Sequence, residues 1–126
     1  MIKLRSLLQL QILYALMGIA YNGVSFYYAM VLKQPLSSTS PVLGTITMTI
    51  YALFLIPGFL GKITFYRILM LVAILVIGWG GIVTHIINIF TQPQLYYSLV
   101  AWAIAVGINV FGLVLNIIAA LGKFKR

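Results

Sequence analysis

The sequence contains neither aspartate nor glutamate. Carboxylates supply general acid–base pairs, catalytic triads with an acidic member, two-metal centres and most Ca²⁺ and Mg²⁺ sites. Membrane-embedded carboxylates also couple proton movement to transport in many pumps and carriers. Their absence predicts that the protein is not an enzyme and that it drives no proton-coupled transport by itself.

Cysteine is also absent, and His85 is the only histidine. Zinc and similar metals need several nitrogen, oxygen or sulfur ligands, and none gather around His85 in the sequence. A haem group usually takes a second axial ligand, and no spacing of methionine or tyrosine selects one. The sequence therefore predicts no metal and no cofactor, while the missing cysteines leave the redox compartment open.

Apolar residues dominate what is present: 63% of the 126 residues are hydrophobic, and the mean hydropathy is +1.16. Four apolar runs are each long enough to cross a hydrocarbon core of about 30 Å as a helix. These runs cover residues 7–32, 42–61, 68–90 and 95–121. They lack the alternation of barrel strands, and lipid requires backbone groups to be satisfied internally. We therefore predict an all-α fold, an integral membrane four-helix bundle with one domain over residues 1–126.

The charged residues are all basic and lie mostly on one predicted side of the membrane. Only Lys33 falls in the loop between the first two helices. The other seven are Lys3, Arg5, Lys62, Arg67, Lys123, Lys125 and Arg126. The positive-inside rule therefore predicts cytoplasmic N and C termini in a bacterial-type inner (plasma) membrane. Anionic lipid headgroups are the predicted partners of this basic face, and nucleic acid is not, because no further basic surface exists.

The two halves of the chain resemble each other weakly. Arg5, Ile12, Leu13 and Gly18 recur 62 positions later as Arg67, Ile74, Leu75 and Gly80. Duplication of one helical hairpin would produce such a tandem repeat, as in some transporters. Chance matches among common apolar residues would produce it equally well, so both explanations stay open.

Each predicted helix carries a face of small and polar residues at helical spacing. The first has Gln11, Ala15, Gly18, Asn22 and Ser25, the second has Gly44, Thr47 and Tyr51, the third has Gly78, Gly81, His85 and Asn88, and the fourth has Trp102, Ala105, Asn109, Gly112 and Asn116. Such faces are typical of packing between membrane helices, which lack a hydrophobic drive toward one another. A second interpretation is functional: the polar residues concentrate in the outer halves of the helices, which predicts a shallow cavity that opens outward.

Five residues are the candidates for contact with a ligand or a partner: Asn22, Ser25, His85, Asn88 and Asn109. We expect Asn22 and Asn109 to form the floor of the cavity. For His85, the favoured interpretation is an imidazole that is hydrogen-bonded to a neighbouring helix. A ligand contact is the alternative, since ionisable residues within spans are often functional.

These observations favour a small non-enzymatic membrane protein that serves as an accessory or assembly subunit. It would pack against a larger membrane complex or against copies of itself. The alternative is a small carrier, channel or binding protein for a neutral or anionic solute, which would use the outward polar cluster. A third interpretation is a haem- or quinone-binding electron-transfer subunit that uses His85.

Overall fold

The computed structural model describes all residues from 1 to 126, and most of them are helical. In chain order the elements are β1 (Ile2–Lys3), α1 (Leu4–Val31), α2 (Pro41–Phe54), α3 (Ile56–Phe59), α4 (Ile63–Ile77), the π-helical turn η1 (Gly78–Val83), α5 (Thr84–Thr91), the 3₁₀ turn η2 (Pro93–Leu95), α6 (Leu99–Leu121) and β2 (Phe124–Lys125). Four helices are long and apolar enough to cross a membrane: Leu4–Val31, Pro41–Phe59, Ile63–Thr91 and Leu99–Leu121. The predicted all-α fold is confirmed.

Local sequence signals set the ends of these helices. The Ser40 hydroxyl accepts a hydrogen bond from the Leu43 amide, and Pro41 occupies the first helical position, so α2 begins there. Ser98 caps α6 in the same way, which places its start at Leu99 instead of the expected residue 95. Gly122 ends α6 in the left-handed conformation, with φ of 70°.

The second long helix is broken near its end. Pro57 lacks an amide proton, and the helix is interrupted at Leu55 between α2 and α3. The third long helix begins at Ile63, earlier than the expected residue 68, and therefore includes Arg67. The Arg67 Nε donates to the Ala120 carbonyl at 2.9 Å, which satisfies a backbone group at the C-terminal end of α6.

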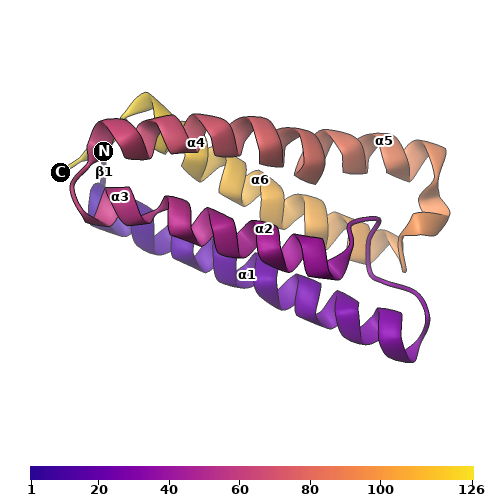
Figure 1. Cartoon of the computed structure of the whole chain (residues 1–126). Helices are drawn as coiled ribbons and strands as arrows, with labels where there is room; N and C mark the ends of the chain where they lie inside the picture. Colours follow the sequence, from indigo (N-terminus) through magenta and orange to yellow (C-terminus); the bar gives the residue numbers. More distant parts are fainter.

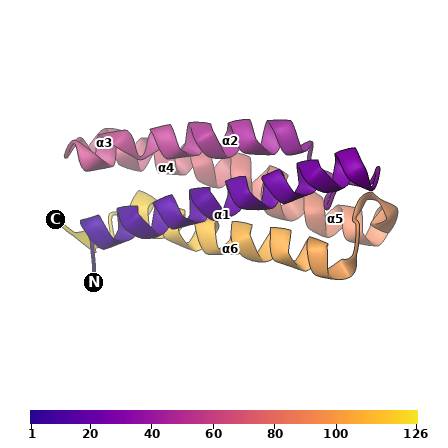
Figure 2. The same ribbon diagram turned by 90° about the horizontal axis from the view of Figure 1, so that it is seen from below.

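The helices form two hairpins, α1 with α2 and α4–α5 with α6 (Figure 1). α1 packs against both α2 and α6, and α6 packs against α4, whereas α2 and α4 touch at few points. Figure 2 shows the same bundle from below, with α2 above α4 and α1 above α6. The central core therefore lies where α1 and α6 meet the other two helices, and the contact between α2 and α4 is the loosest.

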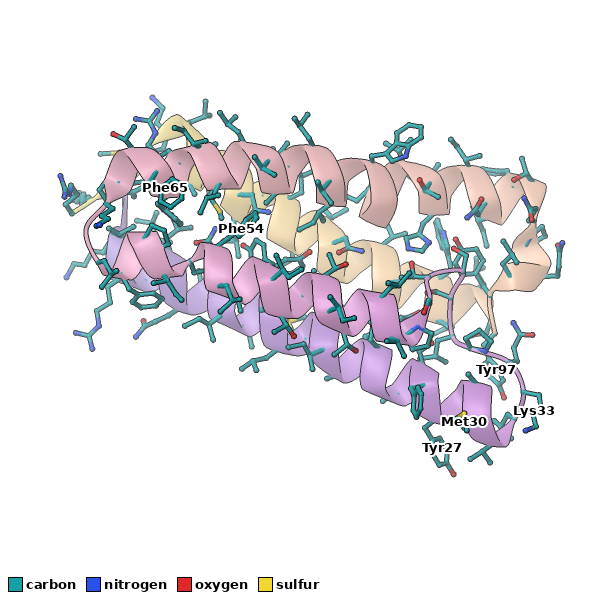
Figure 3. The ribbon with its side chains drawn as sticks, in the orientation of Figure 1. Tyr27, Met30, Lys33, Phe54, Phe65 and Tyr97 are labelled. Carbon is teal, nitrogen blue, oxygen red and sulfur yellow. The ribbon has the colours of Figure 1, made fainter.

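Both chain termini lie at one end of the bundle, which we call the terminal end (Figure 1). There Ile2 pairs with Phe124 and Lys3 with Lys125 in a short parallel β-ladder. The opposite end carries the loops of residues 32–40 and 92–98, and we call it the loop end. Lys33 lies there, beyond the projecting tip of α1 (Figure 3).

Large apolar side chains cover the outside of the bundle. Leu75 is 73% exposed, and Leu16, Ile104 and Leu121 are each at least half exposed. A soluble protein of this size rarely exposes so much continuous apolar surface, whereas lipid requires it. The exterior is thus typical of an integral membrane protein.

Candidate ligand-binding cavity

A cavity of about 200 Å³ lies inside the bundle, between its middle and the loop end. All four long helices and the loop of residues 32–40 contribute to its wall. The lining residues are Gly18, Tyr21, Asn22, Ser37, Thr39, Gly44, Thr47, Met48, Val76, Ile77, Gly80, Gly81, His85, Ala105, Ile108 and Asn109. None of them is acidic or permanently charged.

Asn22 reaches the cavity from α1 because Gly44 of α2 leaves room for it. A Cβ atom at position 44 would collide with the Asn22 carboxamide. The Asn22 Nδ2 donates to the Gly18 carbonyl of its own helix at 2.8 Å. Its Oδ1 accepts no hydrogen bond from the protein and remains available as an acceptor.

Asn109 enters the cavity from α6 and is held on both sides. Its Oδ1 accepts from the Tyr14 hydroxyl at 2.9 Å, and its Nδ2 donates to the Gly81 carbonyl at 3.0 Å. Gly81 belongs to the π-helical turn η1, and a Cβ there would lie 2.8 Å from the Asn109 carboxamide. Such turns are rare and often occur at functional sites.

His85 lines the cavity on the side of the loop end and is only 3% exposed. Its Nδ1 lies 2.6 Å from the Tyr96 hydroxyl, and its Nε2 lies 3.3 Å from the Thr39 hydroxyl. The Trp102 indole donates to the His85 backbone carbonyl at 2.9 Å. The imidazole is therefore hydrogen-bonded on both nitrogens, and it connects α5 with the two loops of the loop end.

Ser25 and Asn88 hold the loop of residues 32–40 in place. The Ser25 hydroxyl accepts from the Leu36 amide at 2.9 Å, and the Asn88 Nδ2 donates to the Ser38 hydroxyl at 3.2 Å. Ser37 of the same loop is 3% exposed and lies against the cavity. The loop therefore folds inward and lies against the loop-end side of the cavity.

Three of the five candidate residues thus meet in one cavity, namely Asn22, His85 and Asn109. The sequence interpretation missed Ser37, Thr39 and Tyr21, which also line it. A cluster of four hydroxyl residues between two prolines was the available signal for the loop residues, but whether a loop is buried depends on the packing of distant helices.

Two of the four hydroxyl groups of the cavity wall donate to the backbone. The Tyr21 hydroxyl donates to the Ala101 carbonyl at 2.8 Å, and the Thr47 hydroxyl donates to the Leu43 carbonyl at 2.8 Å. The Thr47 oxygen and the Asn22 Oδ1 accept no hydrogen bond from the protein, whereas the Ser37 hydroxyl is placed to donate to the Tyr21 oxygen. A guest molecule would therefore meet more hydrogen-bond acceptors than donors.

A second polar cluster, which the sequence interpretation did not predict, lies toward the terminal end. The Gln11 Nε2 donates to the Asn116 Oδ1 and contacts the Met70 sulfur, both at 3.1 Å. The Tyr51 hydroxyl donates to the same Asn116 oxygen at 2.6 Å, and the Tyr66 hydroxyl donates to the Gln11 Oε1. These five side chains are buried, and only the Asn116 Nδ2 lacks a partner.

Comparison of the chain with family models, curated proteins and solved structures gives no match. The functional argument therefore depends on the geometry of the cavity. That geometry offers hydrogen bonds to uncharged groups in a space that Ser37 and Thr39 line at the loop end, and no group of three or more histidine, cysteine or acidic side chains could hold a metal ion.

Proposed function

We propose that the protein is an integral membrane protein that binds a small, uncharged, hydroxyl-bearing molecule in this cavity. The observation that carries the proposal is the pair of free acceptors on Asn22 and Thr47, in a cavity to which all four long helices contribute. A hydroxyl hydrogen from the guest would satisfy each of them. Large voids are few in protein interiors, and the space between the helices of a bundle is a common place for a small-molecule site.

The size and charge of the cavity restrict the guest. An engineered cavity of about 150 Å³ is large enough to bind benzene, so about 200 Å³ accommodates a group of one six-membered ring. Burying an ion without a charged partner is costly. The proposal therefore narrows the solute class from neutral or anionic to neutral.

The basic residues support a membrane orientation with both termini in the cytoplasm of a bacterial-type cell. All except Lys33 belong to segments at the terminal end. The same residues would contact anionic lipid headgroups. Because the chain lacks cysteine, single substitutions test this directly: we expect Gln94→Cys, but not Lys125→Cys, to react with a membrane-impermeant maleimide in intact cells.

The accessory-subunit interpretation stays a prediction, because the apolar exterior would suit lipid and a protein partner equally well. Electron transfer through a haem bound to His85 is disfavoured, since Thr39 and Tyr96 already contact the two imidazole nitrogens. Binding in the cavity has the stronger structural support.

Calorimetric titration of the protein in lipid nanodiscs tests the proposal, with empty nanodiscs as the reference for partitioning into lipid. Three ring-sized probes differ only in their polar groups: resorcinol has two hydroxyl donors, 1,3-difluorobenzene has none, and benzoate is an anion. We expect resorcinol to bind and the other two to bind at least about tenfold more weakly, because neither donates a hydrogen bond.

Matched variants localise the binding. Thr47 and Thr49 both donate to the carbonyl four residues earlier, but only Thr47 lines the cavity. We expect Asn22→Leu and Thr47→Val to weaken resorcinol binding and Thr49→Val to leave it unchanged. Equal affinity for resorcinol and 1,3-difluorobenzene, or no binding of resorcinol, would refute the proposal.

A further inference from the structure

A second hollow adjoins the cavity along the bundle. It is an apolar groove of about 210 Å³ between α2 and α4. Its residues are Thr47, Ile50, Tyr51, Phe54, Val72, Ala73, Val76 and Ile77. Thr47, Val76 and Ile77 also line the cavity, so the two hollows share a wall. Phe54 lies between α2 and α4, at the end of the groove nearer the chain termini (Figure 3).

The groove exists because α2 and α4 pack against other helices and touch each other little. Three residues of its walls are well exposed: Ile50 at 47%, Val72 at 41% and Val76 at 56%. The groove is therefore open to the surroundings of the bundle, which is the hydrocarbon interior of a membrane if the proposed function is correct. The loop end of the cavity, in contrast, is covered by Ser37 and Thr39.

We propose that the bound molecule is a single-chain amphiphile: an alkyl- or prenyl-substituted phenol or quinol whose ring lies in the cavity and whose chain lies in the groove. This inference rests on the proposed function, which supplies the hydroxylated ring. The evidence for the chain is the continuity of the two hollows. A substituent on the ring that leaves the cavity past Thr47 and Val76 enters the apolar groove directly.

The same geometry gives the route of entry. The exposed side of the groove is an open approach from the bilayer, and an amphiphile dissolved in the bilayer already lies at that depth. Ordinary phospholipids fit poorly, since their phosphate would need a charged partner and the cavity has no acidic or permanently charged residue.

The experiment compares resorcinol with 4-hexylresorcinol, which has the same ring and adds a six-carbon chain. Both are titrated into nanodiscs, with empty nanodiscs as the reference. Val72→Trp fills the groove from its α4 wall and Ile50→Trp from its α2 wall. The control is Leu71→Trp, since Leu71 is 54% exposed and lines neither hollow.

We expect each groove variant to weaken 4-hexylresorcinol binding by at least about fivefold, because the chain loses its packing contacts. Resorcinol affinity should change by less than about twofold, and Leu71→Trp should change neither. If resorcinol binds and the groove variants leave 4-hexylresorcinol unaffected, or weaken both ligands equally, the inference is overturned while the proposed function stands. If resorcinol itself does not bind, the proposed function fails first.

Discussion

The bundle contains two polar regions built from the same kinds of residue, and they differ in how their space is filled. At the cavity, Gly44 and Gly81 accommodate only the slim carboxamides of Asn22 and Asn109, and a hollow of about 200 Å³ remains. In the cluster around Gln11, bulky tyrosine and methionine side chains occupy the interior and are fully or almost fully buried. Side-chain volume, and not polarity, therefore distinguishes a candidate binding site from polar packing.

Tyr14 lies at the boundary between the two regions. Its hydroxyl donates to Asn109 of the cavity, and its ring packs edge-on against Tyr51, with ring centroids 5.1 Å apart. Gly112 of α6 makes room for this ring, since a Cβ there would collide with it. One aromatic side chain thus links the two polar regions.

The largest expected effect is on the filled cluster. Gln11→Leu removes the acceptor of the Tyr66 hydroxyl and a donor to Asn116, and we expect the free energy of unfolding to fall by about 2–3 kcal/mol. Unfolding in mixed micelles titrated with SDS measures this change. Resorcinol affinity should stay within about twofold of wild type, because no residue of the cluster lines the cavity.

The control for that variant is Gln9→Leu, since Gln9 is an exposed residue of the same helix. It should change the free energy by less than about 0.5 kcal/mol. An equal loss for both variants would contradict the structural role given to the cluster.

A smaller effect is expected at Gly81, where the absence of a side chain leaves room for the Asn109 carboxamide. Gly81→Ala forces the Asn109 carboxamide to move, and we expect a loss of about 1–2 kcal/mol together with weaker resorcinol binding. The matched control is Gly78→Ala, because Gly78 belongs to the same turn, does not line the cavity, and a Cβ there meets nothing within 4 Å. If the two alanine variants behave alike, the close approach of η1 and α6 is not what shapes the cavity.

The smallest expected effect concerns the covering loop. His85→Leu removes the contacts with Thr39 and Tyr96, and we expect the loop to open more often by a factor of about five, which corresponds to about 1 kcal/mol. The rate of maleimide labelling of Ser37→Cys reports this opening, since Ser37 is 3% exposed in the closed loop. An unchanged labelling rate would mean that His85 does not hold the loop.

Much of the fold could be predicted from the sequence, because lipid allows long helices only where apolar residues are nearly continuous. The helical spacing of Asn22, His85 and Asn109 likewise placed them on inward faces, and the cavity contains all three. Those two inferences need only the amino-acid composition of the chain and the helical spacing of its polar residues.

Other features depend on tertiary packing and could not be read from the sequence. Arg67 was expected in a loop, but it lies in α4, where its Nε donates to the Ala120 carbonyl of α6. The π-helical turn at Gly78–Val83 has no clear local signal, yet it offers the Gly81 carbonyl to Asn109. The burial of Ser37 follows from contacts between residues far apart in the chain.

The central claim is that the region around Asn22 is a hollow, whereas the region around Gln11 is filled. Water-edited solid-state NMR of the ligand-free protein in lipid bilayers measures polarisation transfer from water to each side-chain amide. We predict rapid transfer to the Asn22 carboxamide and little transfer to that of Gln11. Equal transfer to both amides, or none to Asn22, would contradict the account.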